Sequence, residues 1–441
     1  MRQLFGTDGV RGRAGHFLTA ELALALARTA VMRAEQERPQ VLIVRDTRES
    51  GEMLEAAIAA GVTAAGGDAL LAGVLPTPAA PLLVLRHGLH LAAVISASHN
   101  PYEDNGIKLF AADGFKLDDD TEHQIEAELD QPFPPPSWIG RVRPFRGALE
   151  DYVRQLHARF TELDLSGRRV LLDCANGATY KAAPELFRRL GAEVEVISDE
   201  PDGRNINQGC GSTHLHAVVE KMRIGAYDVA FAFDGDGDRV LAVDRDGLVV
   251  DGDELIALTA VHLRRSERLP GNGVAVTVMT NYGFHTAMAA AGVEVATTPV
   301  GDRYVLDELR RRRWALGGEQ SGHIIELGFG PSGDGIASAL LALEALAGRD
   351  LSERDAMQKL PQRLVNIRAS DRPSLAAAIE HPTVQAAIKR EDQALAGRGR
   401  VLVRASGTEP LARVMVEAPS QQETDQVCDR LRAVVEAALG L

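Results

Sequence analysis

The segment that decides the fold begins VLIVRDTR (Val41–Arg48), an apolar, β-branched run that ends in polar and charged residues. A helical stretch follows, and AAGGDALLAG (Ala64–Gly73) then carries the chain through glycines into a second apolar run. Two strands roughly twenty to thirty residues apart, with a helix between them, are typical of a βαβ crossover. The segment therefore predicts parallel strands in an α/β layer.

The same unit occurs twice more along the chain. VLLDCANGATY (Val170–Tyr180) precedes a helical stretch and RRLGAEVEVI (Arg188–Ile197), and VAVTVMTNYGF (Val274–Phe284) precedes another helical stretch and AAAGVEVATTP (Ala289–Pro299). Each copy has a strand, a polar loop, a helix, a glycine and a second strand. We therefore expect three related α/β domains.

The domain boundaries follow from composition. QPFPPPSWIG (Gln131–Gly140) is rich in proline and reads as a linker, and further breaks are expected near residues 244–253 and 359–367. The tail after the last break has two strand-like runs, GRVLVRAS and LARVMVEA, and a helix from about Gln421, which indicates a small α+β domain. A chain of 441 residues has room for three or four domains. We expect domains at residues 1–146, 147–247, 248–362 and 363–441.

Composition narrows the class of protein. With 48 basic and 62 acidic residues the net charge is −14, which argues against a nucleic-acid binder. The apolar stretch from Phe17 to Met32 carries Glu21 and Arg28, so it predicts an amphipathic helix and not a membrane span. The N-terminus has glycines and charges where a signal peptide is apolar, and the three cysteines have no metal spacing. These features predict a cytoplasmic protein.

The loop after a strand-like run ending at Phe233 alternates aspartate with glycine. Its sequence, DGDGDR, brings Asp234, Asp236 and Asp238 so close that they repel one another unless a cation lies between them. Oxygen ligands favour a hard ion such as Mg²⁺. An EF-hand is excluded, because arginines stand where that loop needs glycine and glutamate (Arg239, Arg245).

A second polar loop, ISASHNPYEDNGIK (Ile95–Lys108), carries a serine directly after an apolar run. Ser98 and His99 are a poor nucleophilic pair, because adjacent side chains on an extended segment point to opposite sides. A serine in a chain that also has a Mg²⁺ loop indicates phosphoryl chemistry, with Ser98 as the carrier of the phosphate. Lys108 is a candidate acid or base once burial lowers its pKa.

Two more loops carry groups suited to a phosphate or to sugar hydroxyls. In RASGTEPLAR, backbone N–H groups, two hydroxyls and guanidinium groups form a candidate phosphate cradle: Arg404, Ser406, Gly407, Thr408 and Arg413. In GEQSGH, Glu319 and Ser321 suit sugar hydroxyls, and His323 titrates near neutral pH. Taken alone, each of these loops is also compatible with an ordinary turn.

Taken together, the motifs resemble the α-D-phosphohexomutase family. The resemblance runs nearly end to end, through FGTDGVRG, ISASHNPYEDNGIK, DGDGDR, GEQSGH and RASGTEPLARVMVE in that order. It implies three similar α/β domains with mixed sheets and a small C-terminal α+β domain, arranged around one deep cleft. It also implies an isomerase that is a phosphoprotein and binds one Mg²⁺ per chain.

The resemblance implies a role for each motif residue. Ser98 is the serine that must be phosphorylated, and Asp234, Asp236 and Asp238 hold Mg²⁺ with a phosphoserine oxygen as a further ligand. The side chains implied in proton and phosphoryl transfer are Lys108, His323, Arg11 and Arg239. The residues implied in binding the sugar and its second phosphate are Gly301, Asp302, Glu319, Ser321, Arg404, Ser406, Gly407, Thr408 and Arg413.

Three segments favour the branch of the family that acts on amino sugars. They are NINQGCGSTH (Asn205–His214), VGDRYV (Val300–Val305) and GEQSGH, in which Gln320 replaces the methionine usual in mannose and glucose enzymes. The implied reaction converts glucosamine 6-phosphate into glucosamine 1-phosphate through a 1,6-bisphosphate, on the route to UDP-N-acetylglucosamine and cell-wall precursors. A homodimer is also implied. The alternatives are a mannose or glucose phosphate mutase, a phosphatase and a non-catalytic sugar-phosphate sensor.

Overall fold

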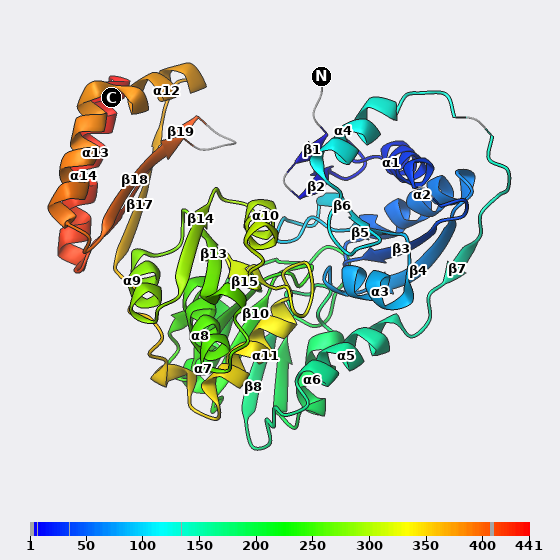
Figure 1. The fold of residues 1–441 in the computed structure, drawn as a ribbon, viewed down its shortest axis with the longest axis horizontal. Helices are drawn as coiled ribbons and strands as arrows, with labels where there is room; N and C mark the ends of the chain where they lie inside the picture. Colours follow the sequence, from blue (N-terminus) through cyan, green and yellow to red (C-terminus); the bar gives the residue numbers. More distant parts are fainter. Residues whose placement is uncertain (1–3, 7, 35, 134, 406–409) are drawn as a thin grey trace. The chain divides into compact units, whose positions relative to one another are not determined.

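The computed structural model describes residues 4–6, 8–34, 36–133, 135–405 and 410–441. Within these residues the strands form four sheets, of seven, five, four and three strands (Figure 1). The chain makes two compact units. Residues 1–279 with 293–354 carry the first three sheets, and residues 280–292 with 355–441 carry the fourth.

The first sheet has the order β1-β2-β6-β5-β3-β4-β7. One half, β5-β3-β4-β7, is parallel, and the other half, β1-β2-β6-β5, is antiparallel. The strands are β1 (Phe5–Gly6), β2 (Gly9–Arg13), β3 (Gln40–Arg45), β4 (Asp68–Val74), β5 (Leu91–Ile95), β6 (Asp104–Ala111) and β7 (Val142–Pro144). The helices are α1 (Ala20–Arg33), α2 (Ser50–Ala64), α3 (Ala79–His87) and α4 (Asp119–Glu128).

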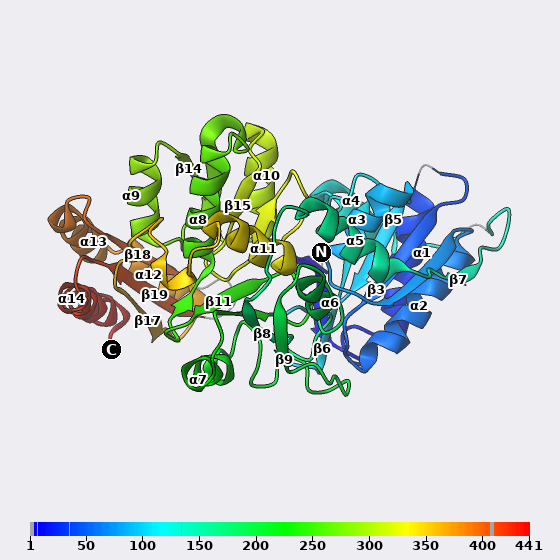
Figure 2. The same cartoon turned by 90° about the horizontal axis from the view of Figure 1, so that it is seen from below.

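Helices α1 and α2 lie side by side against this sheet (Figure 2). Small residues permit the close approach: a Cβ on Gly61 of α2 would lie 2.3 Å from the carbonyl oxygen of Leu24 in α1. Leu26 of α1, Ile58 of α2 and Ile43 of β3 are buried in one apolar cluster. Burial of such side chains is the main stabilising contribution to this layer.

The second and third sheets belong to the same unit as the first. Their orders are β12-β11-β10-β8-β9 and β14-β13-β15-β16. The second contains β8 (Arg169–Asp173), β9 (Glu193–Ile197), β10 (Val229–Phe233), β11 (Val240–Asp244) and β12 (Val249–Val250), with α5 (Ala148–Arg159), α6 (Ala182–Arg189) and α7 (His216–Ile224). The third contains β13 (Gly273–Thr277), β14 (Glu294–Thr298), β15 (Leu316–Gly318) and β16 (Ile324–Glu326), with α8 (Gly252–Arg265), α10 (Asp302–Arg312) and α11 (Gly335–Leu346).

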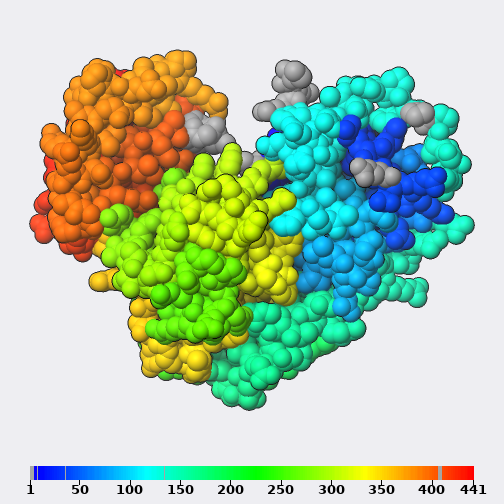
Figure 3. Space-filling view, in the orientation of Figure 1, coloured from blue at the N-terminus to red at the C-terminus, as the bar shows by residue number. Residues whose placement is uncertain are grey.

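These three layers form one body. In the space-filling view the blue, cyan, green and yellow segments of this unit share a continuous surface (Figure 3). Contacts between the layers include the backbone of Thr77, which donates to the carbonyl oxygen of Asp236 at 2.8 Å, and Thr47, which donates to the carbonyl oxygen of Asn176 at 2.6 Å. Loops from different sheets are therefore held in register with one another.

The second unit is built on an antiparallel sheet with the order β17-β19-β18. Helix α9 belongs to this unit, where Tyr282 N donates to Glu417 Oε2 at 2.9 Å. Val384, Val414 and Leu431 are buried in its core. Its elements are α9 (Tyr282–Ala290), β17 (Gln362–Arg368), α12 (Arg372–Glu380), α13 (Pro382–Leu395), β18 (Arg400–Ala405), β19 (Leu411–Glu417) and α14 (Gln421–Leu439).

The predicted fold class is confirmed. The strands of each repeated unit, β3 with β4, β8 with β9 and β13 with β14, are parallel neighbours. The C-terminal helix begins at Gln421, as expected. Among the described residues, no helix combines the length and the hydropathy needed to span a bilayer. The three boundaries between the four domains remain predictions.

Candidate active site

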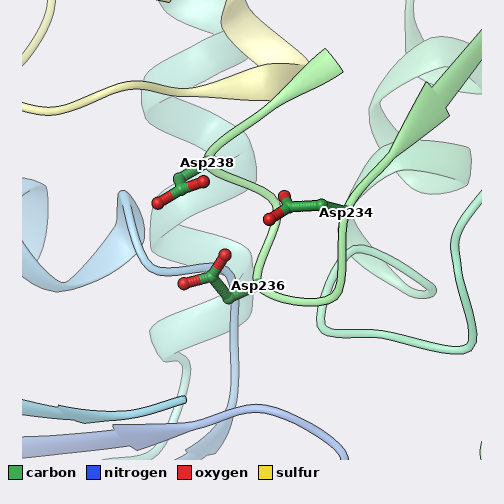
Figure 4. A group of neighbouring side chains, drawn as sticks. All are labelled: Asp234, Asp236 and Asp238. Atoms are coloured by element: carbon green, nitrogen blue, oxygen red, sulfur yellow. The ribbon is translucent and has the colours of Figure 1, made fainter. Parts of the chain in front are cut away.

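An acidic loop joins β10 to β11, two antiparallel strands of the second sheet. Asp234, Asp236 and Asp238 are all buried, at 0%, 1% and 5% exposure. One carboxylate oxygen from each lies within 4.8 Å of the others, and the three carboxylates point toward a common space (Figure 4). Burial of three acidic groups this close together is unfavourable unless cations face them.

A glycine in this loop brings the triad against Ser98. A Cβ on Gly235 would lie 2.6 Å from the carbonyl oxygen of Ser98 and 2.7 Å from Asn207 Nδ2. Any side chain at this position would push the acidic loop away from the serine. The glycine at position 235 is therefore needed for the acidic loop to pack against Ser98.

The triad has the electrostatics of a cation site. Burial, then the charges of Asp238 and Asp236, raise the pKa of Asp234 well above its usual value. Asp236 Oδ1 is buried and accepts no hydrogen bond from any described residue. A donor set made only of carboxylate oxygens fits a hard divalent cation. The triad is thus able to hold a metal ion.

Ser98 lies in the loop between β5 and β6, and it is 1% exposed. Its hydroxyl donates to Asp234 Oδ2 at 2.5 Å, from a backbone with φ of +54°. The segment is therefore not extended, and Ser98 Oγ lies 3.3 Å from His99 Nδ1. The prediction that the side chains of Ser98 and His99 point to opposite sides is wrong, because the left-handed backbone of Ser98 brings Oγ close to His99 Nδ1.

Burial and Arg239 keep His99 from acting as a cation. The pKa of His99 is lowered to about 4, by burial first and then by the charges of Arg239 and Arg11. Arg239 Nη1 lies 3.0 Å from His99 Nδ1 and donates to it. His99 is therefore a neutral neighbour of Ser98 that helps to orient Arg239.

Lys108 projects from β6 into the triad and is 1% exposed. Its Nζ lies 2.8 Å from Asp236 Oδ2, 3.3 Å from Asp238 Oδ2 and 3.0 Å from Asp8 Oδ2. Burial favours the neutral amine, but the charges of Asp236, Asp8 and Asp238 outweigh it and raise the pKa of Lys108 well above its usual value. The expectation of a lowered pKa is wrong here, because the sequence did not show how many carboxylates surround this amine.

Arg11 on β2 reaches the same loops. It pairs with Asp8, and its Nη1 donates to the carbonyl oxygen of Ala97 at 3.4 Å. Burial would lower the pKa of Arg11, but the charges of Asp8, Asp236 and Asp238 outweigh it, so its pKa is raised. A permanently charged guanidinium thus lies beside the serine loop.

The third sheet contributes His323, which is 4% exposed. Its Nδ1 lies 3.5 Å from Asp238 Oδ1 and its Nε2 lies 3.8 Å from Asp302 Oδ2. Burial opposes protonation, but the charge of Asp238 and its hydrogen bond outweigh burial and raise the pKa of His323. Gly333 N donates to Nε2 at 3.2 Å, which places the proton of the neutral ring on Nδ1.

Asp302 is bound to a lysine that the sequence analysis did not single out. Lys116 Nζ lies 2.5 Å from Asp302 Oδ2 and also pairs with Asp8. The charges of Asp302 and Asp8 outweigh burial and raise the pKa of Lys116. An alternating chain of charges therefore joins the first sheet to the third beside the triad.

In the GEQSGH loop, the carboxylate of Glu319 lies at the N-terminus of α10. Glu319 Oε1 accepts from Gly301 N at 3.0 Å, directly before α10, and Glu319 Oε2 accepts from Ser321 Oγ at 3.4 Å. Glu319 is 8% exposed, and Ser321 is exposed. The structure thus brings Glu319, Ser321 and Gly301 together.

The RASGTEPLAR loop lies in the second unit. Arg404 on β18 is directly opposite Arg413 on β19, and the pKa of Arg404 is lowered by burial and then by the charge of Arg413. Arg413 Nε is buried and makes no hydrogen bond with any described residue. Two guanidinium groups side by side favour an anion. Ser406, Gly407 and Thr408 lie outside the described residues.

Sequence reasoning missed several residues that contact the site. Lys116 pairs with Asp8 in its own layer and with Asp302 of the third, and Thr77 Oγ1 donates to Asp236 Oδ2 at 2.6 Å. Asp8 is part of the quoted motif FGTDGVRG, so its position was a usable signal. Thr77 and Lys116 stand in ordinary-looking segments, and only the packing of different sheets shows their contacts.

Comparison with known families accounts for nearly the whole chain. Four domain families described as phosphoglucomutase/phosphomannomutase match it: domain I at residues 2–133, domain II at 150–247, domain III at 251–364 and the C-terminal domain at 364–434. The chain belongs to the phosphoglucomutase/phosphomannomutase family of phosphohexomutases.

Relatives within that family that align over nearly the whole chain include phosphoglucosamine mutases. That of Moorella thermoacetica is 47% identical over 98% of this chain and 99% of its own, and that of Desulforudis audaxviator is 48% identical over 99% and 98%. The crystal structure of a phosphoglucomutase/phosphomannomutase family protein from Burkholderia thailandensis is 24% identical, covers 99% of this chain and 98% of its own, and has a TM-score of 0.82. That structure shares the fold.

Proposed function

We propose that the protein interconverts glucosamine 6-phosphate and glucosamine 1-phosphate through a phosphorylated Ser98 and a 1,6-bisphosphate intermediate. One observation carries the proposal: the Ser98 hydroxyl is buried 2.5 Å from Asp234 in a triad suited to a cation. A purely sugar-binding protein has no need of a serine in such a position. The identity to phosphoglucosamine mutases over nearly the full chain supports the amino sugar as substrate.

The reaction balances as two phosphoryl transfers. In the first, the bond between Ser98 Oγ and phosphorus breaks, a bond from phosphorus to O1 of the sugar forms, and the O1 proton leaves to a base. The 1,6-bisphosphate then turns around, the bond between O6 and phosphorus breaks, a bond from phosphorus to Ser98 Oγ forms, and an acid returns a proton to O6. Lys108 and His323 are the proton-transfer candidates, because both lie at the triad in polar surroundings.

We assign Mg²⁺ to Asp234, Asp236 and Asp238, with an oxygen of phosphorylated Ser98 as a further ligand. Bound there, the cation would neutralise negative charge on the phosphoryl group during its transfer. Arg11 and Arg239 add permanent positive charge near the serine, which stabilises the same developing charge. The unpartnered, buried Oδ1 of Asp236 supports this assignment.

We assign substrate binding to the two loops that carry sugar- and phosphate-binding groups. Glu319 and Ser321 would bind sugar hydroxyls. Gly301 contacts Glu319, and Asp302 lies near His323. The cradle for the phosphate that is not reacting would contain Arg404, Ser406, Gly407, Thr408 and Arg413. A cradle that recognises phosphate by charge tolerates both orientations of the bisphosphate.

Further parts of the proposal concern the working state of the protein. We propose a homodimer in the cytoplasm that is activated by a hexosamine 1,6-bisphosphate. The buried free thiols of Cys174, Cys210 and Cys428 are compatible with a reducing compartment. The domains 1–146, 147–247, 248–362 and 363–441 would each contribute one loop to the reaction cycle.

The decisive experiment combines an isomerase assay with mass analysis. Purified protein is given glucosamine, glucose or mannose 6-phosphate with Mg²⁺ and a trace of 1,6-bisphosphate, and the product isomers and inorganic phosphate are measured. We expect the glucosamine isomer to form fastest, with almost no phosphate release and a phosphate on Ser98 by peptide mapping. Steady phosphate release would support a phosphatase, and a faster mannose or glucose reaction would support a sister mutase.

Replacement of the serine completes the test. Ser98→Ala should remove turnover, lowering kcat by on the order of 10³-fold or more, while substrate affinity measured by calorimetry changes little. His16→Ala, which alters an exposed residue away from the triad, is the control. Undiminished turnover in Ser98→Ala would refute the proposed function.

A further inference from the structure

The backbone of Ser98 has a conformation that a residue with a Cβ seldom adopts. Its φ of +54° lies in the left-handed region, where Cβ crowds the following carbonyl group. Such a conformation persists only when surrounding groups hold it in place. Contacts that fix the backbone of residues 98–101 therefore determine where the hydroxyl of Ser98 lies.

One side chain that holds this loop is Arg48, which follows β3 and is 0% exposed. Its Nη2 donates to the carbonyl oxygens of Ser98 at 2.9 Å and Asn100 at 2.8 Å, and its Nη1 donates to that of Pro101. A planar guanidinium offers several donors in fixed directions, so it holds three carbonyl groups in one arrangement. Arg48 contacts the backbone of the loop at three points.

The other end of the Ser98 residue is tied to the same ion pair. Asp46 Oδ2 accepts from Arg48 Nε at 2.9 Å and from Ser96 Oγ at 2.6 Å. Ser96 Oγ in turn accepts from Ser98 N at 2.9 Å. The N–H and the carbonyl group of Ser98 are therefore both fixed through Asp46 and Arg48, in a closed ring of buried hydrogen bonds.

A second side chain reaches the loop from the segment between β9 and α7. Asn207 is 6% exposed, and its Nδ2 donates to the carbonyl oxygens of Ser98 at 2.9 Å and Asn100 at 3.1 Å. Asn207 also lies where a Cβ on Gly235 would clash, so it spans from the acidic loop to the serine loop. It links the position of Ser98 to that of the triad.

We propose that Arg48 and Asn207 are positioning residues for phosphoryl transfer at Ser98. No hydrogen bond joins either side chain to Ser98 Oγ among the described residues, and both hold the carbonyl group of Ser98 so that the hydroxyl faces Asp234. The inference rests on the proposed function, because positioning matters only if Ser98 carries the phosphoryl group. A shift of about 1 Å at a reacting atom lowers a rate by on the order of 100-fold.

The test separates positioning from folding by means of Arg48→Lys. Lysine keeps the charge that faces Asp46 but has no planar fork for three carbonyl groups. We expect kcat to fall on the order of 100-fold while KM for glucosamine 6-phosphate stays within about twofold, because the sugar-binding loops are untouched. Arg354→Lys is the matched control. Arg354 is likewise held by acidic side chains, those of Asp244 and Glu254 at 2.7 and 2.8 Å, and its replacement should leave kcat unchanged.

A second variant covers the case in which Arg48→Lys does not fold. Asn207→Asp has the same shape but places carboxylate oxygen against two carbonyl oxygens, so we expect the same loss in kcat with little change in KM. A crystal structure of either variant should show Ser98 with a negative φ. The inference would be overturned if a folded Arg48→Lys or Asn207→Asp protein kept the wild-type kcat. This holds also if KM rises in that protein while kcat stays unchanged. An inactive wild-type protein would instead refute the proposed function.

Discussion

The hydroxyl of Ser98 donates to Asp234 Oδ2 at 2.5 Å, although 136 positions separate the two residues in the sequence. The contact joins a loop of the first sheet to a loop of the second. Burial and the neighbouring Asp238 and Asp236 raise the pKa of Asp234 well above its usual value. The serine therefore faces a carboxyl group that binds either a proton or a metal ion.

The first prediction concerns the exchange of a proton for a metal ion. A raised pKa means that Asp234 holds a proton to higher pH than a free aspartate, and Mg²⁺ must displace this proton. Affinity for Mg²⁺ should therefore weaken as the pH falls, and binding should release protons. Calorimetry in two buffers of different ionisation enthalpy counts them. His16→Ala, which keeps both the triad and Ser98, serves as the control. Binding that does not depend on pH and releases no proton would contradict the prediction.

The second prediction tests the steric role of Gly235. Gly235→Ala adds a Cβ that would lie 2.6 Å from the carbonyl oxygen of Ser98. The loops must separate, so kcat should fall on the order of 100-fold. Steady-state kinetics with thermal denaturation measures this. Gly330→Ala is the control, since a Cβ there meets nothing within 4 Å. Equal activity in the two variants would show that the loops have room for a methyl group.

The third prediction concerns the arginine pair of the second unit. Arg413→Met removes a guanidinium that faces Arg404 across the two strands. Like charges repel, so the protein should be no less stable, whereas loss of a phosphate contact should raise KM by about 10-fold. Kinetics and a melting curve give both quantities, with Arg432→Met, an exposed helix residue, as the control. A fall in stability without a rise in KM would assign Arg413 a purely structural role.

The fourth prediction is a pH dependence of stability. Burial raises the pKa of Asp334 to about 6, although Ala337 N and the hydroxyl of Tyr152 donate to its carboxylate. The folded state thus holds the proton more tightly than the unfolded chain, so this contribution to stability is present at low pH and is lost as the pH rises through about 6.

Asp334→Asn removes this titration and keeps the acceptor for α11. Between about pH 5 and about pH 7 the wild type should lose about 1 kcal/mol relative to this variant, measured by urea denaturation. Asp120→Asn alters an exposed aspartate and should follow the wild type at both pH values. Parallel curves for the wild type and Asp334→Asn would show that Asp334 does not titrate in this range.

Much of the fold follows from local patterns. Apolar runs such as Val41–Val44 and Val274–Val276 alternate with helical stretches, and each pair of runs became parallel neighbours. The alternation works because hydrogen bonding and burial act over a few residues. The motifs likewise identified Ser98, Lys108 and the three aspartates, because their chemistry is unusual at that spacing.

What the amino-acid order determined by itself was the class of fold, the family and the reactive groups, since these depend on local periodicity and on residue type. The tertiary structure decided the rest. It turned Ser98 into the left-handed region, surrounded Lys108 with three carboxylates and placed Arg48 and Asn207 on the serine's carbonyl group. Those outcomes arise from contacts between residues far apart in the chain, where burial and charge depend on the packing of three sheets and not on any neighbour in sequence.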